Sequence, residues 1–199
     1  QRQMCIRDRK YCEENTVLDS IRGRLLTDLA SCYMIEGDIR EATSQYLTAL
    51  DATSKSGDSE AYLTNCSSLG VAYRRINLPD SALYYYGKGL EAAMKSKDYS
   101  AVSNLHANIA VMYISFKQLE NAKEHAREAI TYALKEEDAL DWLQAYYICG
   151  SLLVKTGEYD QAINYLHKAY GIASRQQSPR FRLKVLSALL PAFQATAQD

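Results

Sequence analysis

Residues 61–89, AYLTNCSSLGVAYRRINLPDSALYYYGKG, decide the fold of this chain because their pattern returns at an offset of forty residues. In the next copy, Ala110 stands in the place of Gly70, and Ala122 stands in the place of Ala82. The same offset aligns four blocks of the chain without a gap. Self-similarity at a fixed period predicts a repeat protein, in which each unit packs mainly on its neighbours.

The aligned columns hold small or aromatic residues, except for Leu153 and Leu166 in the fourth block. Two helices approach closely only where side chains are small, so small columns are expected at the contacts within and between repeats. The aromatic columns are expected to fill the spaces between helices. The five columns are Ala30, Gly70, Ala110 and Gly150; Ala42, Ala82, Ala122 and Ala162; Ala49, Gly89, Ala129 and Ala169; Tyr33, Tyr73, Tyr113 and Leu153; and Tyr46, Tyr86, Ala126 and Leu166.

Each block contains two helical patterns. In the first block, apolar residues at i, i+3, i+4 and i+7 run from Leu26 to Tyr33, which is the spacing of one helix face. A short turn that begins at Gly37 follows, and glycine readily ends a helix in the left-handed conformation. The predicted helices span residues 16–36, 39–56, 59–76, 80–96, 99–116, 119–136, 139–156, 159–176 and 179–197.

The bulk composition is that of a folded protein. The chain has 199 residues, of which 47% are hydrophobic and 24% charged, and its net charge of −1 argues against a nucleic-acid partner. The sequence contains no run of 18 apolar residues, so no membrane span is predicted. Residues 1–10 are interpreted as a non-native or disordered tail. Residues 11–199 are expected to form a single array, with repeats at about 19–58, 59–98, 99–138 and 139–178. Residues 179–199 are expected to form the first helix of a fifth repeat, without its second helix.

The blocks resemble tetratricopeptide repeats, whose signature is W-x2-L-G-x2-Y followed by A-x3-F and A. The second block supplies Cys66, Leu69, Gly70, Tyr73, Ala82, Tyr86 and Gly89 at these positions. It departs from the signature in lacking the closing proline and in its period of 40 rather than 34 residues. Such long repeats are similar to those of bacterial peptide-sensing regulators, kinesin light chain, tetratricopeptide histidine kinases and LuxR-type regulators. The resemblance implies an all-α fold, a right-handed superhelical solenoid of about nine helices in antiparallel hairpins.

The resemblance also implies a function. Such arrays are scaffolds that bind a protein or peptide on the concave face formed by the first helix of each repeat. We expect the sensory or interaction array of a larger bacterial signalling protein, either a tetratricopeptide histidine kinase or a LuxR-type regulator. The alternative is a stand-alone adaptor or assembly factor with no effector domain. No cofactor is expected.

Ten residues fall on the expected concave face by their register in the repeats. Asn104 and Asn108 lie one helical turn apart, so their amides are expected to grip the backbone of an extended peptide. The cations are expected to attract a carboxylate, and the alternative is that all are ordinary solvated residues. The ten residues are Ser67, Val71, Arg74, Arg75, Asn104, Asn108, Val111, Tyr147, Ser151 and Lys155.

No motif predicts an enzyme or a metal site. The chain lacks a nucleophile–base set, a glycine-rich phosphate loop and an H-E-x-x-H sequence. Its five cysteines have no C-x-x-C spacing, so Cys32, Cys66 and Cys149 are predicted to be small apolar residues in helices. The histidines are interpreted as surface residues: His106, His125 and His167.

The last predicted helix has an apolar flank that includes Leu183, Leu186, Leu189, Leu190 and Phe193. Arrays need a polar cap at each end. We therefore expect either that the native chain continues past this helix, or that the helix mediates self-association. The unpaired cysteines favour a cytoplasmic over a periplasmic location, although the compartment is left open.

Overall fold

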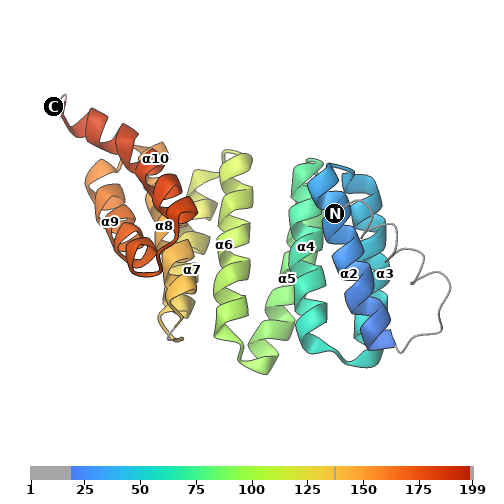
Figure 1. Cartoon of the computed structure of the whole chain (residues 1–199). Coiled ribbons are helices and arrows are strands. Elements are labelled where there is room, and N and C mark those ends of the chain that lie inside the picture. The colour runs from blue at the N-terminus through green and yellow to red at the C-terminus, as the bar shows by residue number, and fades with distance from the viewer. Residues whose placement is uncertain (1–18, 137, 198–199) are drawn as a thin grey trace. The chain divides into compact units, whose positions relative to one another are not determined.

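The computed structural model describes residues 19–136 and 138–197, and these residues are helical with no strand (Figure 1). They fall into two compact units that divide between Ser96 and Lys97, and each unit is described by itself. The N-terminal unit contains α2 (Asp19–Glu36), α3 (Ile39–Ser56), α4 (Ser59–Arg75) and α5 (Pro79–Ser96). The C-terminal unit contains α6 (Tyr99–Ser115), α7 (Leu119–Ala133), α8 (Ala139–Thr156), α9 (Tyr159–Arg175) and α10 (Pro179–Thr196).

The predicted all-α arrangement of antiparallel hairpins is confirmed, and the predicted helix bounds are close to those observed. The largest difference is α7, which ends at Ala133 rather than at residue 136. The indole Nε1 of Trp142 donates to the carbonyl of Ala133 at 2.7 Å and to that of Glu136 at 3.0 Å. A side chain of the following helix therefore satisfies carbonyls at the end of α7. The interpreted tail at residues 1–10 and the first residues of the predicted helix 16–36 lie outside the described residues.

The turns between helices share one backbone conformation at intervals of twenty residues. Each described turn of this kind contains one left-handed residue, with φ between 49° and 89°: Gly37, Gly57, Asn77, Lys97, Lys117, Gly157 and Gln177. The next N–H donates back into the helix just ended, as from Asp38 to the Tyr33 carbonyl at 3.0 Å. The helix that follows is often capped by an aspartate at its N-terminus. The side chain of this N-cap residue accepts a backbone N–H from the first turn of the helix. The four aspartates that do so are Asp38, Asp58, Asp98 and Asp138.

The small columns hold the two helices of each hairpin close together. A Cβ added to Gly70 in α4 would lie 2.2 Å from Cε1 of Tyr86 in α5. In the C-terminal unit, a Cβ added to Gly150 would lie 2.6 Å from Cγ of Leu166. The rings and branched side chains of one helix therefore occupy the space that a side chain on the other would need. Tyr86 is completely buried in this way.

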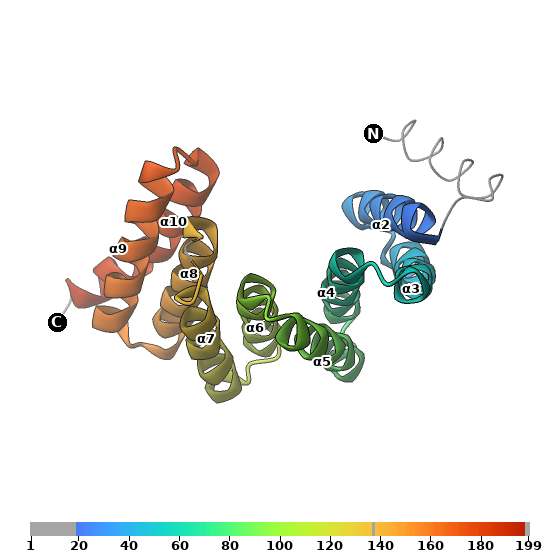
Figure 2. The same cartoon turned by 90° about the horizontal axis from the view of Figure 1, so that it is seen from below.

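The first helix of each hairpin also contacts the first helix of the next one within a unit. We call α2, α4, α6, α8 and α10 the A helices, and α3, α5, α7 and α9 the B helices. In the N-terminal unit α2 contacts α4, and in the C-terminal unit α8 contacts both α6 and α10 (Figure 2). The A helices of each unit therefore share one surface, which we call the A-helix face.

A pair of glycine substitutions tests the close approach. Gly70→Ala is expected to lower the free energy of unfolding by about 1–3 kcal/mol, because the added methyl group collides with the buried Tyr86 ring. Gly87→Ala lies on the same hairpin, where an added Cβ meets nothing within 4 Å, and should raise stability by about 0.5–1 kcal/mol. Urea unfolding followed by circular dichroism measures both, and equal effects would contradict the packing described.

Candidate functional site

A groove of about 290 Å³ lies on the A-helix face of the C-terminal unit, between α8 and α10. We call it the C-terminal groove. Its walls combine aliphatic, aromatic, hydroxyl and cationic side chains, so it offers both apolar surface and polar partners to a ligand. The residues that line it are Tyr147, Ser151, Val154, Lys155, Lys184, Ser187, Ala188 and Pro191.

Several polar groups of this groove are left without a hydrogen bond or a carboxylate partner among the described residues. The Ser151 Oγ is buried and forms no hydrogen bond. Neither Lys155 nor Lys184 forms an ion pair with a carboxylate among the described residues. Pro191 has no N–H, so it cannot donate to the carbonyl of Ser187 one helical turn earlier. The groove thus presents a buried hydroxyl, a carbonyl deprived of its usual helical donor and two cations.

A smaller groove of about 220 Å³ lies between α2 and α4 in the N-terminal unit. Its cation is already paired, because Arg24 Nε lies 2.8 Å from Asp58 Oδ2. This hydrogen bond from Arg24, with a second from the Ala61 N–H, lowers the pKa of Asp58 to about 2. The Asp58 carboxylate is therefore ionised at neutral pH and neutralises the arginine, which leaves this groove less able to attract an anion. The lining residues are Arg24, Thr27, Asp28, Glu60, Ala61 and Thr64.

The structure brings three of the ten predicted site residues together in the C-terminal groove: Tyr147, Ser151 and Lys155. Asn104, Asn108 and Val111 lie on α6 of the same unit and are half-buried. The other four, Ser67, Val71, Arg74 and Arg75, lie on α4 of the N-terminal unit.

Both predicted arginines act on other groups of their own unit. Arg75 Nη1 donates to the carbonyl of Met34 at 3.1 Å. Burial raises the pKa of Tyr86 to about 12, and the nearby Arg74 partly opposes this shift. Their predicted role in attracting a carboxylate therefore stays a prediction.

Asn104 links two A helices. Its amide nitrogen donates to the Ser100 carbonyl at 3.1 Å and to Asp141 Oδ1, on α8, at 2.9 Å. Asp141 is only 7% exposed, and its Oδ2 has no hydrogen-bond partner. A peptide held by the nitrogen of Asn104 would have to displace these bonds, so the two-asparagine clamp remains a prediction, and the present contacts give Asn104 a structural role.

Five residues of the C-terminal groove were missed in the sequence: Val154 lies on α8, and the other four lie on α10. The signal that could have found them is the repeat register itself. Lys184 continues the column of Asn104, Ser187 that of Tyr147, and Pro191 that of Ser151. The fifth A helix therefore supplies the second wall of the groove.

Family models match both units of the chain. One tetratricopeptide repeat model matches residues 22–95, and another matches residues 103–136 and 143–176. The chain belongs to the tetratricopeptide repeat family. No curated protein has a sequence that matches it significantly.

Three solved structures resemble this tetratricopeptide chain. BtubC (BKLC) from P. vanneervenii has a TM-score of 0.79 and 19% identity, over 98% of this chain and 81% of that one. A putative kinesin light chain with nearly identical TPR-like repeats from Podosopora anserina has a TM-score of 0.70 and 18% identity, over 90% of this chain and 89% of that one. A Rap protein complexed with Competence and Sporulation Factor has a TM-score of 0.76 and 14% identity, over 90% of this chain and 53% of that one. At these identities the likeness shows the fold alone.

Two histidines meet between the helices of one tetratricopeptide hairpin, so their interpretation as surface residues was wrong. His106 Nδ1 on α6 and His125 Nδ1 on α7 are 2.9 Å apart, which requires one nitrogen to donate and the other to accept. His106 stacks on Tyr132 at 5.7 Å between ring centroids, and His125 stacks on Tyr113 at 5.5 Å. The register position of His106 holds Leu26, Cys66 and Tyr146 in the other repeats, and that of His125 holds Gln45, Tyr85 and Tyr165.

The surroundings of this pair favour neutral imidazoles. Burial, followed by the charge of His125, lowers the pKa of His106 to about 4. Burial also lowers the pKa of His125, while Glu124 and Glu128 oppose that shift.

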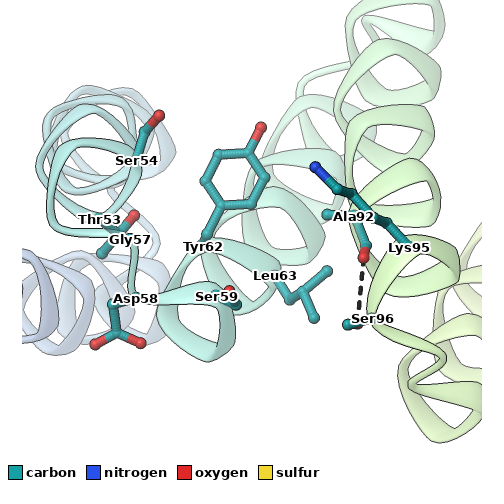
Figure 3. A pocket seen from close by; sticks show the side chains of 10 residues that line it. All are labelled: Thr53, Ser54, Gly57, Asp58, Ser59, Tyr62, Leu63, Ala92, Lys95 and Ser96. Carbon is teal, nitrogen blue, oxygen red and sulfur yellow. Dashed lines mark hydrogen bonds between the residues drawn. The ribbon is translucent and has the colours of Figure 1, made fainter.

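A larger pocket of about 460 Å³ lies where the ends of α3, α4 and α5 meet in the N-terminal unit (Figure 3). Tyr62 and Lys95 project toward the same side of it from α4 and α5. Two hydroxyl groups that line this pocket already donate hydrogen bonds within their own helices. Thr53 Oγ1 donates to the Ala49 carbonyl, and Ser96 Oγ donates to the Ala92 carbonyl. No lining residue carries a buried polar atom without a partner. We therefore favour the C-terminal groove over this larger pocket as the candidate site.

Tetratricopeptide folds are typically scaffolds without catalytic activity. Within residues 19–136 and 138–197, no group of three or more histidine, cysteine, aspartate or glutamate residues could hold a metal ion. Cys66 and Cys149 are buried and free, and burial raises the pKa of each thiol to about 11, so their predicted role as small apolar residues in helices is confirmed. No helix in the described part of the chain is both long and apolar enough to cross a membrane.

Removing the amide of Asn104 should destabilise the C-terminal unit. Asn104→Ala leaves the buried Asp141 carboxylate without its N–H donor, and we expect a loss of roughly 1–3 kcal/mol in urea unfolding. Asn104→Ala/Asp141→Ala removes both partners and should lose less than the sum of the two single variants. Strictly additive losses would show that the two side chains are not coupled.

The histidine pair should make stability depend on pH between about 4 and 6.5. The folded-state pKa of each histidine lies below the ordinary value of 6.5, so the neutral pair contributes its stability fully above pH 6.5. That contribution falls as pH decreases from 6.5 toward 4, because the unfolded chain then binds more protons. We expect the thermal midpoint to drop by several degrees over this range.

The control for the pH experiment is His106→Leu/His125→Tyr, which places at these positions the residues that Leu26 and Tyr165 supply in other repeats. Its midpoint should change much less between pH 6.5 and 4.5. An equal slope in the variant would assign the pH dependence to other groups.

Proposed function

We propose that this chain is a protein-binding scaffold that holds an extended, carboxylate-bearing peptide on the A-helix face of its C-terminal unit. The observation that supports this most directly is the C-terminal groove, where the buried Ser151 hydroxyl forms no hydrogen bond and neither Lys155 nor Lys184 pairs with a carboxylate among the described residues. Buried polar groups without a partner cost free energy, so a ligand that supplies one gains that energy on binding.

The charge of the A helices in this unit favours an anionic ligand. They carry four cations, namely Lys155, Arg180, Arg182 and Lys184. The single carboxylate on the described A helices of this unit is Asp141, which is buried and bonded to Asn104. The A helices of this unit therefore carry an excess of positive charge, and two of its cations, Lys155 and Lys184, line the groove itself, which attracts carboxylates and speeds their association.

The groove also suits a peptide backbone. The Ser187 carbonyl can accept from a peptide N–H because Pro191 has none to offer, and Ser151 can donate to a peptide carbonyl. Tyr147 and Val154 supply apolar surface beside these groups. An extended segment with an acidic side chain or a free C-terminus would use all three kinds of contact.

We also propose that the array belongs to a larger bacterial signalling protein of the histidine-kinase or LuxR-type class. The Rap protein, a structural neighbour, is complexed with Competence and Sporulation Factor, and this chain spans 53% of its length. The alternative is a stand-alone adaptor, since this chain spans 81% of BtubC and 89% of the kinesin light chain repeats, so the matched fold makes up most of those chains. A kinase or helix-turn-helix domain encoded in the same natural reading frame would support the first, and an effector-free frame the second.

Matched peptide pools test the ligand class. Fluorescein-labelled random octapeptides would be prepared as a Glu/Asp pool and a Gln/Asn pool, each with a free or an amidated C-terminus. Fluorescence anisotropy with the whole chain should show tighter binding for pools that carry a carboxylate, and comparison of the four arms shows whether it comes from side chains or from the C-terminus. Lys155→Gln/Lys184→Gln should weaken that binding by about tenfold or more, because two cations are lost from one groove.

The matched control is Lys117→Gln/Lys168→Gln, which removes two cations that do not line the groove, and it should leave binding unchanged. Ser151→Leu should block the groove without changing its charge. Equal affinity for all four pools would overturn the carboxylate preference. Binding unaffected by either groove variant would overturn the location.

A further inference from the structure

α10 carries a stripe of large apolar side chains that stay about half exposed or more, although the ring of His167 meets that of Phe193 edge-on at 6.0 Å between centroids. Leu183, Leu186, Leu190 and Phe193 are 68%, 48%, 59% and 45% exposed. Their spacing of three, four and three residues is that of the a and d positions of a coiled-coil seam. We call these four residues the leucine stripe.

The leucine stripe is distinct from the two other surfaces of α10. Val185, Leu189 and Ala192 are buried, and Val185 and Leu189 belong to the core formed with α9. The C-terminal groove uses a second set of positions, Lys184, Ser187, Ala188 and Pro191. The stripe occupies the remaining side of the helix. A partner bound to the stripe would therefore leave the groove positions of α10 accessible.

In the preceding A helix, the corresponding face is covered by a B helix. The positions forty residues earlier are Leu143, Tyr146, Gly150 and Leu153 on α8. Three of them are buried and Tyr146 is half-buried, in the hairpin that α8 forms with α9. The repeat register therefore marks the leucine stripe as a helix-binding face.

The residue at position 190 disfavours a hairpin packed as closely as the one formed by α8 and α9. In α8 this position is Gly150, where even a Cβ would lie 2.6 Å from Leu166. Leu190 puts a whole leucine side chain at that point, so a B helix cannot approach as closely as α9 approaches α8. A partner must instead meet the stripe side chain to side chain, at the wider spacing of a leucine seam.

We propose that the helix that covers the leucine stripe is α10 of a second copy of this chain, packed antiparallel about a two-fold axis. In this arrangement Leu186 faces Leu190 of the partner subunit, and Leu183 faces Phe193 of the partner subunit. The same four residues thus form both halves of the contact, as an isologous interface requires. Each copy of α10 supplies both the side chains that insert into the other helix and the spaces that receive them.

Charge decides between the antiparallel and the parallel arrangement. Arg180, Arg182 and Lys184 lie near the N-terminus of α10, where a helix already has positive polarity and where the first turn holds no acidic residue. A parallel pair would bring six cations together. An antiparallel pair places each cationic end beside the C-terminal carbonyls of the other helix, which have negative polarity and no basic residue in their last turn.

Sedimentation equilibrium of the 199-residue chain tests the association. The expected species are a 22.4 kDa monomer and a dimer of twice that mass. The interface is short, so we expect a dissociation constant on the order of 10–100 µM. Leu186→Glu should raise this constant at least tenfold, because it buries a carboxylate against leucine. The control Leu140→Glu changes a similarly exposed leucine, 55% exposed on α8, and should leave the constant unchanged.

A mixture of two charge variants tests the orientation. Leu186→Glu and Leu190→Lys should each be monomeric alone. Mixed in equal amounts they should form a heterodimer, because the antiparallel pairing opposes the new glutamate to the new lysine and keeps one leucine–leucine contact. Circular dichroism of each variant confirms that it is folded.

A wild-type chain that stays monomeric at 500 µM would overturn the proposal. A Leu186→Glu variant that still forms dimers would also overturn the proposal, because those dimers would have to use another surface. Failure of the mixture to associate, with a dimeric wild type, would overturn the antiparallel arrangement. None of these results depends on peptide binding, so they are independent of the function proposed for the groove.

Discussion

Each repeat of this chain depends on two helix backbones that approach one another at residues without a large side chain. Gly70 beneath the ring of Tyr86 is the clearest case, because the ring fills the place of the missing side chain. Gly150 beneath Leu166 repeats the arrangement in the C-terminal unit. Once the hairpins are closed in this way, successive A helices in a unit come into contact, and the spaces between them form the grooves. The candidate ligand site is therefore a consequence of hairpin packing and needs no loop of its own.

The two grooves differ because of how their cations are used. In the N-terminal unit Arg24 is neutralised by Asp58. In the C-terminal groove Lys155 and Lys184 have no such partner among the described residues. The same register thus gives one surface with internal charge balance and another with unbalanced positive charge. It follows that a repeat array can localise binding to one unit while its backbone geometry stays uniform.

The repeat period and helix bounds could be predicted from sequence because they depend on local patterns and on small residues at fixed intervals. The contacts between His106 and His125, and between Asn104 and Asp141, could not, because each joins side chains from different helices and depends on their conformations. The end of α7 was missed for the same reason, since a tryptophan from the following helix bonds its last carbonyls. The wall that α10 adds to the groove was a different kind of omission. The columns that define it were visible, but they were not continued into the fifth A helix.

The left-handed residues at intervals of twenty have a consequence for how such a chain can change its length. One residue inserted inside a helix would turn everything after it by about 100°, which would move the small columns off the contacts they make. Inserted residues are better accommodated in the turns, where the chain already leaves the helical path. Gain or loss of whole forty-residue segments preserves every column at once. Duplication of complete repeats is therefore the change of length that this architecture tolerates best, and it would add a new groove with each copy.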